Sequence, residues 1–410
     1  MMNSNKINEI HLGLEDWVEA SLARRRLERN NSFEQLAKLT VVIASFGRPD
    51  FLMRQAVYWG YSKAQIIIVD GSPQPLTDRM RKIMDGVSNI RYLHASEGYF
   101  SRMKLAAEYI QSPYVVTLAD DGFLFKGALC RAIALLDKNN ELVACNGQVV
   151  NFDPTALKAG ISYYKSDYTF WKYAILENKV EDRLAHAMGT YNAATCYSVL
   201  RRDVWIRAWG RNIEVCASPS AGEIYLAITI YLYGKLDTLD DVFVLHSNEN
   251  PSISIKSFDR NLTFLTWWRS PRFAAEREDF INRLATIAMD CLGINVTESR
   301  KIVENAVASY LALCEDRKKG ALLRSIRNTT RVTISKMLRR IMPPSVFRAL
   351  QLRVRKLFGV DYQGGGGNEI DVRQMAVGSS DALNNQIEIQ LIENLVLEFY
   401  EVRAKNKVIQ

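Results

Sequence analysis

Residues 40–45 read TVVIAS, an apolar run rich in β-branched side chains that is ended by Gly47 and Pro49. A short apolar run between turn residues predicts a buried β-strand. Two runs of the same kind follow, QIIIVD at 65–70 and YVVTL at 114–118, with helical spacing between them. Apolar strands that alternate with helices predict an α/β fold, with a mostly parallel, Rossmann-like sheet covered on both faces.

The same patterns extend along the rest of the chain. We expect further strands at 89–94, 142–150, 193–200 and 242–245, and helices at 49–61, 77–85, 99–111, 127–138 and 222–233, the last with Glu223 in its first turn. Beyond about residue 257, helical patterns predict a mainly helical C-terminal region. Four glycines at 364–367 indicate a linker. The expected organisation is a helical lead-in, a sheet domain, a basic helical region, a linker and a final helix, at 1–38, 39–256, 257–360, 361–380 and 381–410.

The composition limits the class of protein. The chain has 410 residues, of which 48% are hydrophobic and 24% are charged; this excludes a largely disordered chain. The sequence has no apolar run near the ~18–20 residues of a membrane helix, and its polar N-terminus lacks the apolar core of a signal sequence. Six cysteines form no CxxC pair, so we expect free thiols in a reducing cytoplasm rather than a zinc site or disulfides.

Polar residues follow three of the predicted strands: Ser45 and Arg48 the first, Asp70 the second, Asp120 and Asp121 the third. The carboxyl ends of parallel strands meet at one edge, where such sheets bind ligands. Burying two adjacent carboxylates is costly unless a positive charge neutralises them. Mg²⁺ or Mn²⁺, which take oxygen ligands, would do so. The alternative for the dipeptide is a solvated turn or a helix cap.

Three motifs in this order, VVIASFGRP, IIIVDGS and LADDGFLFKGAL, resemble the nucleotide-sugar-binding half of the family 2 glycosyltransferases, which have the GT-A fold. The resemblance covers about residues 39–248 and extends to a bacterial branch found in surface-polysaccharide gene sets. It implies a glycosyltransferase that moves a sugar from a nucleotide diphosphate sugar to a glycan or lipid-linked acceptor. It also implies Mn²⁺ or Mg²⁺ as the cofactor and single displacement with inversion.

The resemblance implies roles for residues on the donor side. Ser45 and Arg48 lie in the loop that would face the nucleotide, with Arg48 near the base or a phosphate; a surface charge is the alternative. Asp70 matches the carboxylate that binds the nucleoside, although the sequence DGS also favours turn capping. Arg102 and Lys104, at a helix start, would pair with phosphate oxygens, or else belong to an exposed helix face.

The remaining implied roles concern the metal ion. Asp120 and Asp121 match the metal-binding aspartates, but Gly122 stands where the family often has a third acidic or amide residue. This departure leaves open whether one or both aspartates bind the ion. His246, after a predicted strand, would lie on the metal or the diphosphate; a histidine at a strand end with no such role is the alternative.

The resemblance further implies a general base on the acceptor side. Glu223 occupies the position of the family's Gly-Glu-Asp-like motif, with Ile224 in place of the usual aspartate. An acidic residue at a helix start is also favourable for the helix dipole alone. Asp153, Asp240 and Asp241 are the other candidates for the base.

Residues 317–360 contain 13 Lys and Arg and no Asp or Glu, in a chain whose net charge is +8, so the rest of the chain has a net charge of −5. Apolar residues recur in this segment at helical spacing. A basic amphipathic helix can bind an anionic membrane surface. The alternative is that it packs on the sheet domain or on a sister subunit in a homo-oligomer. We do not expect nucleic-acid binding, because interleaved aromatic residues are missing.

Two other functions fit parts of the sequence. A sugar-1-phosphate nucleotidyltransferase uses a similar sheet, but its Gly-rich, Arg- and Lys-bearing loop is absent after the first strand. A non-catalytic protein that binds membranes or nucleic acid would use the basic segment alone.

Overall fold

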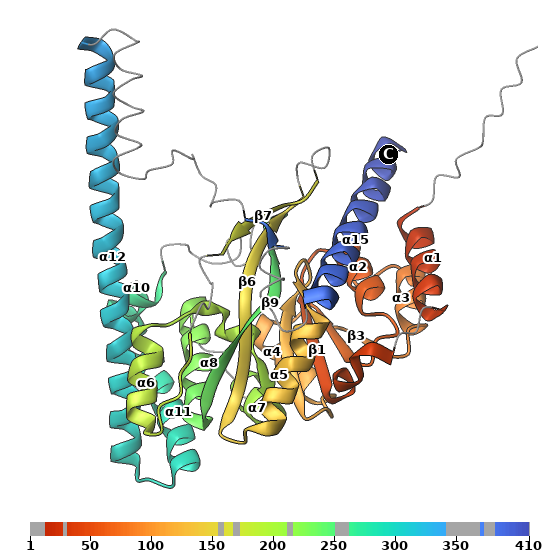
Figure 1. Ribbon diagram of the computed structural model, residues 1–410. Coiled ribbons are helices and arrows are strands. Elements are labelled where there is room, and N and C mark those ends of the chain that lie inside the picture. Colours follow the sequence, from red (N-terminus) through yellow and green to blue (C-terminus); the bar gives the residue numbers. More distant parts are fainter. Residues whose placement is uncertain are drawn as a thin grey trace, which may run out of the picture.

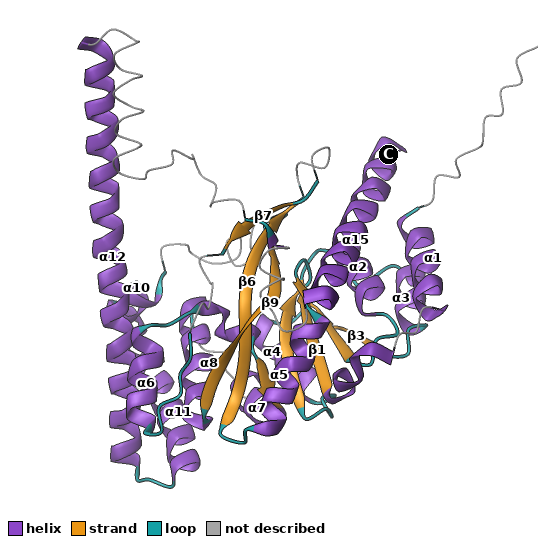
Figure 2. Cartoon of the chain, viewed as in Figure 1, coloured by secondary structure: helices purple, strands orange, loops and turns teal. Residues whose placement is uncertain are grey.

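Figure 1 shows the computed structural model of the chain. It describes residues 13–27, 31–154, 160–166, 173–210, 216–250, 262–341, 370–372 and 382–409. A nine-stranded sheet lies at the centre with helices on both faces (Figures 1 and 2). The expected α/β fold, with a mostly parallel sheet and a mainly helical C-terminal region, is confirmed.

The parallel half of the sheet contains the first four strands, in the order β3-β2-β1-β4. Connecting helices cross between them, as the alternation of patterns predicts. The observed elements agree with the expected ones to within a few residues. They are β1 (Leu39–Ser45), α2 (Pro49–Trp59), β2 (Gln65–Asp70), α3 (Asp78–Asp85), β3 (Ile90–His94), α4 (Tyr99–Ala107) and β4 (Tyr114–Ala119).

The other half of the sheet is mixed. Its strands are β5 (Phe123–Leu124), β6 (Leu142–Asp153), β7 (Ser162–Lys165), β8 (Val199–Arg201) and β9 (Lys235–Ser247). β8 pairs antiparallel with β4 and β6, and β9 runs parallel to β6. The strand predicted at 242–245 is thus the end of a much longer one.

Two local predictions in this half are wrong. The strand predicted at 193–200 is instead the 3-10 helix η2 (Ala193–Tyr197) followed by β8, because the Asn192 side chain accepts from the Ala194 N–H and caps a helical turn. Helix α8 (Pro219–Tyr233) begins three residues before the predicted start. Glu223 therefore lies in the second turn of α8, and the argument from the helix dipole does not apply to it.

Alternate side chains of the buried strands fill two separate cores. Val41 and Ile43 pack on one face of the sheet, and Val42 packs on the other. The first core includes residues of α1 (Leu14–Leu27), α2, α5 (Lys126–Lys138) and α15 (Ala382–Ile409). The second includes residues of α4, α6 (Val180–Gly189), α7 (Arg202–Trp209), α8 and α11 (Ala274–Leu292).

The region after the sheet begins with α10 (Phe264–Arg269), the 3-10 helix η3 (Pro271–Phe273) and α11. Helix α12 (Val296–Ile341) packs on α6 and α11, and its far half stands clear of the domain (Figure 1). Of the basic segment, 317–341 belongs to α12, whereas 342–360 and the glycines 364–367 lie outside the described residues. The lead-in contains α1 and the 3-10 helix η1 (Asn31–Lys38).

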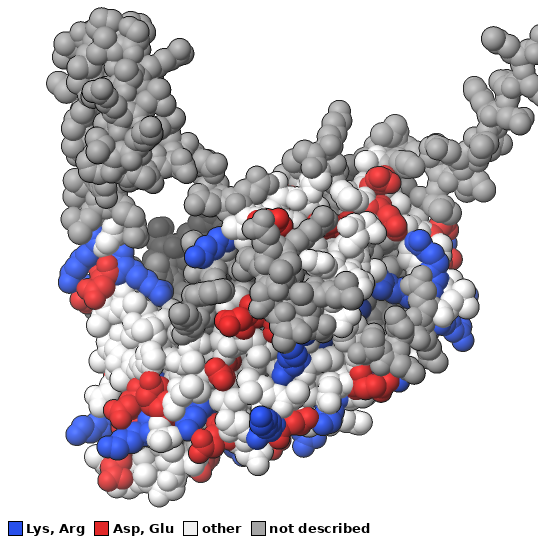
Figure 3. All heavy atoms as spheres, viewed as in Figure 1, with Lys and Arg blue, Asp and Glu red and all other residues white. Residues whose placement is uncertain are grey.

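The surface of the domain has interspersed charges of both signs on the face shown in Figure 3. This agrees with the small net charge that remains outside the basic segment. Within the described ranges, every helix is too short or too polar to span a bilayer.

Candidate active site

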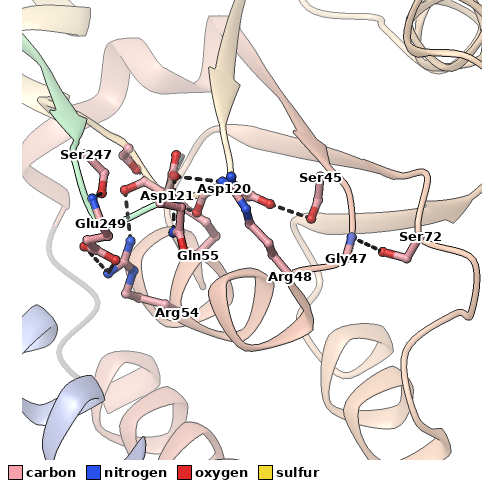
Figure 4. Close-up of polar contacts among 12 residues, drawn as sticks. Ser45, Gly47, Arg48, Arg54, Gln55, Ser72, Asp120, Asp121, Ser247 and Glu249 are labelled. Carbon is pink, nitrogen blue, oxygen red and sulfur yellow. Dashed lines mark hydrogen bonds and ion pairs between the residues drawn. The ribbon is translucent and has the colours of Figure 1, made fainter. Parts of the chain in front are cut away.

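The acidic pair forms a turn at the carboxyl edge of the parallel strands, between β4 and β5 (Figure 4). Asp120 and Asp121 are 1% and 8% exposed. The Arg48 guanidinium lies between them, with Nη1 2.9 Å from Asp120 Oδ1 and 2.7 Å from Asp121 Oδ2. Ser45 Oγ donates to Asp120 Oδ2 over 2.6 Å. Four predicted site residues of the first loop and the acidic turn are therefore linked by direct contacts.

The electrostatics of this turn favour a cation. The pKa of Asp120 is raised to about 6, first by burial and then by the neighbouring charge of Asp121, while Arg48 and Ser45 act in the opposite direction. A carboxylate whose ionised form is costly gains most from an added positive charge. The turn is thus built to be neutralised by a cationic group.

A divalent ion fits this turn provided that a bound diphosphate supplies some of its ligands. Across the described ranges, no three His, Cys, Asp or Glu side chains lie close enough together to hold a metal ion. Asp120 and Asp121 nevertheless offer oxygen ligands at a place that accepts the cationic Arg48. Mg²⁺ and Mn²⁺ commonly complete their shells with phosphate oxygens and water. The residues present therefore fit an ion that binds together with a diphosphate.

His246 lies on β9, the strand that pairs with β5. Burial lowers the pKa of its imidazole, while the negative charge of Asp121 acts in the opposite direction. The ring centroid lies 6.4 Å from that of Tyr197. The structure thus places His246 within electrostatic reach of the acidic turn, and its role as a metal ligand stays a prediction.

Asp70 ends β2 and is 1% exposed. Its Oδ1 accepts from the Ser72 N–H over 2.9 Å, and its Oδ2 accepts from the Tyr92 hydroxyl over 2.7 Å. Ser72 Oγ in turn accepts from the Gly47 N–H over 2.7 Å. The turn capping considered for DGS is therefore present, and it ties the loop after β2 to the loop after β1. Nucleoside binding by Asp70 remains a prediction.

Arg102 and Lys104, both on α4, have different environments. Arg102 is 5% exposed, and its Nη1 donates to Ser45 O over 2.6 Å and to Val69 O over 3.3 Å. It therefore joins the ends of β1 and β2 beneath Gly71. Lys104 is exposed. Lys104 would contact a phosphate group from the solvent side. The hydrogen bonds of Arg102 instead order the loops after β1 and β2.

Glu223 is held by an aromatic partner from the loop after α6. Tyr191 Oη donates to Glu223 Oε1 over 2.7 Å. Burial raises the pKa of Glu223, and both the Tyr191 hydrogen bond and the positive charge of Arg317 counteract this effect. Arg317 Nη2 also donates to Tyr191 O over 2.6 Å. A carboxylate with a raised pKa is suited to accept a proton from a hydroxyl group.

Tyr197 lies within electrostatic reach of both Glu223 and the acidic turn. Burial raises the pKa of Tyr197, and the negative charges of both Asp121 and Glu223 contribute in the same direction. Among the other candidates for the base, Asp241 forms a two-point ion pair with Arg131 at 2.8 Å. Asp240 is exposed and Asp153 is partly buried.

Sequence patterns alone missed the groups that hold the acidic turn from behind. Gln55 donates to the carbonyls of Asp120 and Gly122, and Arg54 donates to the carbonyl of Asp121 (Figure 4). The available signal was two polar residues in an otherwise apolar stretch of α2, FLMRQAVYW. Glu249, the partner of Arg54, is 195 residues further along the chain, and we find no sequence signal for it.

Comparison with known proteins adds the family. Residues 41–204 match the model of glycosyl transferase family 2. Among solved structures, the chain is similar to residues 1–349 of S. aureus TarS, with a TM-score of 0.40 and 12% identity over 69% of this chain and 91% of that one. The complex of this TarS fragment with UDP-GlcNAc gives a TM-score of 0.42 and 11% identity over 69% and 92%. No curated protein matches the sequence.

The family match coincides with the part of the chain that carries the three motifs and the acidic turn. It confirms the resemblance and favours glycosyl transfer over nucleotidyl transfer or a non-catalytic binding role. Residues 41–204 therefore match a family 2 glycosyltransferase domain, and the protein is a glycosyltransferase with the GT-A fold.

Proposed function

We propose that this glycosyltransferase moves a sugar from a nucleoside diphosphate sugar to a glycan or lipid-linked acceptor of bacterial surface polysaccharide, with the help of Mn²⁺ or Mg²⁺. The observation that carries the proposal is the buried Asp120–Asp121 pair with a cationic group between its carboxylates. A bound ion would neutralise charge that develops on the leaving diphosphate. Asp121 would be its first ligand, since Asp120 also accepts from Ser45.

The donor would lie along the loops after β1 and β2. Arg48 is close enough to the acidic turn to contact a diphosphate bound there, and Asp70 and Ser72 fix the loop that would face the nucleoside. Lys104, exposed on α4, is free to approach phosphate from solvent. His246, within reach of Asp121, would add a neutral ligand to the ion or a hydrogen bond to the diphosphate.

Glu223 would accept the proton of the acceptor hydroxyl as that oxygen attacks the anomeric carbon. Its raised pKa suits this task, and Tyr191 fixes the orientation of its carboxylate. Attack from the side opposite the diphosphate breaks the bond between sugar and phosphate in one displacement. The configuration at the sugar is then inverted.

A mutation of the acidic turn tests the proposal. We expect Asp121→Ala to abolish Mn²⁺-dependent turnover of the matching nucleotide sugar, first identified by thermal shift against a panel of nucleoside diphosphates and their sugars. Asp203→Asn, at a side chain that is 79% exposed, is the control and should keep full activity. Unchanged turnover in Asp121→Ala would overturn the metal-dependent assignment.

We further propose that the basic segment 317–360 binds an anionic membrane surface at the cytoplasmic face. Its net charge of +13 supports this, as does the departure of α12 from the domain (Figure 1). Each basic residue near such a surface contributes about 1 kcal/mol. Co-sedimentation with vesicles that contain anionic lipids should be lost at high salt; binding that is equal on neutral vesicles would contradict it.

A further inference from the structure

The C-terminal helix α15 packs directly on the glycosyltransferase domain, although it lies far outside the matched residues 41–204. Four of its apolar residues are at most 1% exposed and join the core on the α2 side of the sheet: Ile389, Ile392, Val396 and Phe399. Figure 1 shows α15 beside α2. The helix is therefore in a position to influence the elements that carry the site.

Helix α2 holds the acidic turn by its backbone. Gln55 Nε2 donates to Asp120 O over 3.0 Å and to Gly122 O over 2.7 Å. Arg54 Nη2 donates to Asp121 O over 2.9 Å. Three successive carbonyls of the turn are thus fixed by two neighbouring side chains (Figure 4). The direction of the two carboxylates depends on this backbone.

Arg54 is itself fixed by a buried carboxylate. Its Nη1 lies 2.9 and 3.1 Å from the two oxygens of Glu249, and the two side chains are 0% and 1% exposed. A buried ion pair holds its geometry only when its remaining polar atoms are also satisfied or enclosed. Arg54 Nε has no hydrogen-bond partner among the described residues, so its environment of aromatic rings matters.

Helix α15 supplies part of that enclosure. The Arg54 guanidinium lies 5.0 Å from the ring centroid of Phe399, besides those of Phe51 at 4.6 Å and Phe123 at 5.0 Å. Tyr400 Oη donates to Glu249 Oε2 over 2.8 Å. A continuous chain of contacts therefore runs from Tyr400 through the ion pair to the carbonyl of Asp121.

We propose that α15 is a positioning element of the active site, in which Tyr400 and Phe399 orient the Glu249–Arg54 pair, and this pair sets the geometry of the acidic turn. The Tyr400 hydroxyl donates to Glu249 rather than to Asp120 or Asp121, so Tyr400 acts on the turn through the Glu249–Arg54 pair. The effect of this positioning on catalysis rests on the proposed function, whereas the structural coupling between α15 and the acidic turn does not.

Hydrogen exchange measured by mass spectrometry on the full-length chain tests the coupling. Tyr400→Phe removes one hydrogen bond to a charged group, and we expect about tenfold faster exchange of the amides at 118–124. Tyr163→Phe is the matched control, because Tyr163 Oη donates over 3.0 Å to another α15 carboxylate, that of Glu393. It should lower the melting temperature similarly and leave exchange at 118–124 unchanged.

A second variant covers the case in which Tyr400→Phe does not fold. Glu249→Gln keeps an acceptor oxygen for Arg54 and should also speed exchange at 118–124. Exchange equal to that of the wild type in the folded variants, or the same acceleration in Tyr163→Phe, would overturn the proposal.

For the matching donor with Mn²⁺, the KM of Tyr400→Phe should rise severalfold more than that of Tyr163→Phe. A wild type without turnover would overturn the proposed function and leave the exchange result valid.

Discussion

The raised pKa of Asp120 makes a quantitative prediction about the pH dependence of stability. This carboxyl has a pKa of about 6 in the folded protein, against an ordinary value of 3.8. The folded state therefore binds the Asp120 proton more tightly than the unfolded state does. The stabilisation is fully present below about pH 4 and is lost as the pH rises through about 6. A shift of this size corresponds to roughly 3 kcal/mol in total.

The variant Asp120→Asn removes this titration. Between pH 4.5 and 7.5, the free energy of unfolding of the wild type should fall relative to that of Asp120→Asn by roughly 2 kcal/mol, because part of the loss occurs below this range. Urea unfolding at the two pH values measures the difference, and Asp203→Asn serves as the exposed control that should follow the wild type. Parallel pH profiles for Asp120→Asn and the wild type would refute the argument from burial.

Three further substitutions test individual contacts. Arg48→Gln removes the cation between the two carboxylates and should destabilise the fold at pH 7.5 by ~3 kcal/mol in urea unfolding. The loss should be smaller at pH 4.5, because protonation of Asp120 then removes the negative charge that Arg48 neutralises at higher pH. Glu223→Gln should lower kcat by about 10²–10⁴-fold and leave the Kd of the donor unchanged, as calorimetry would show. Gly71→Ala places a Cβ 2.4 Å from the Arg102 guanidinium carbon and should lower the melting temperature, whereas Gly98→Ala, with nothing within 4 Å, should not.

Most of the parallel half of the fold was predictable because β1, β2 and β4 are buried on both faces. Such strands are mostly apolar, and the turn residues after them mark their ends. β2 therefore begins and ends where the pattern predicts, at Gln65–Asp70. The segment 193–200 was harder, since its short side chains are compatible with a strand, and the decisive contact is a single cap from Asn192.

The candidate site was predictable to the extent that strand order determines it. β1, β2 and β4 are neighbours, so the residues that follow them meet at one edge. Contacts that bring Arg48 between Asp120 and Asp121 follow from this arrangement. The environment of Glu223 does not, because it depends on how α8 packs against the loop that carries Tyr191. Local patterns contain no information about such packing.

The extent of the folding unit depends on buried polar groups rather than on the glycine-rich segment. Glu388 of α15 accepts from the N–H groups of Lys126 and Gly127, at the start of α5, over 2.7 and 3.3 Å. It also accepts from the Tyr58 hydroxyl over 2.7 Å. Lys126 is buried as well, and burial lowers its pKa to about 8.

A chain cut before residue 381 would lose the carboxylate that caps α5 and the rings that enclose Arg54. Uncapped amides and an unshielded ion pair within a core each cost ~1–3 kcal/mol, a substantial part of the 5–15 kcal/mol that stabilises a typical domain. The acidic turn is attached to both groups through α2, since Tyr58 and Arg54 lie one turn apart on that helix. Truncation should therefore weaken the site and the fold together, which is the behaviour of a helix that belongs to the catalytic domain.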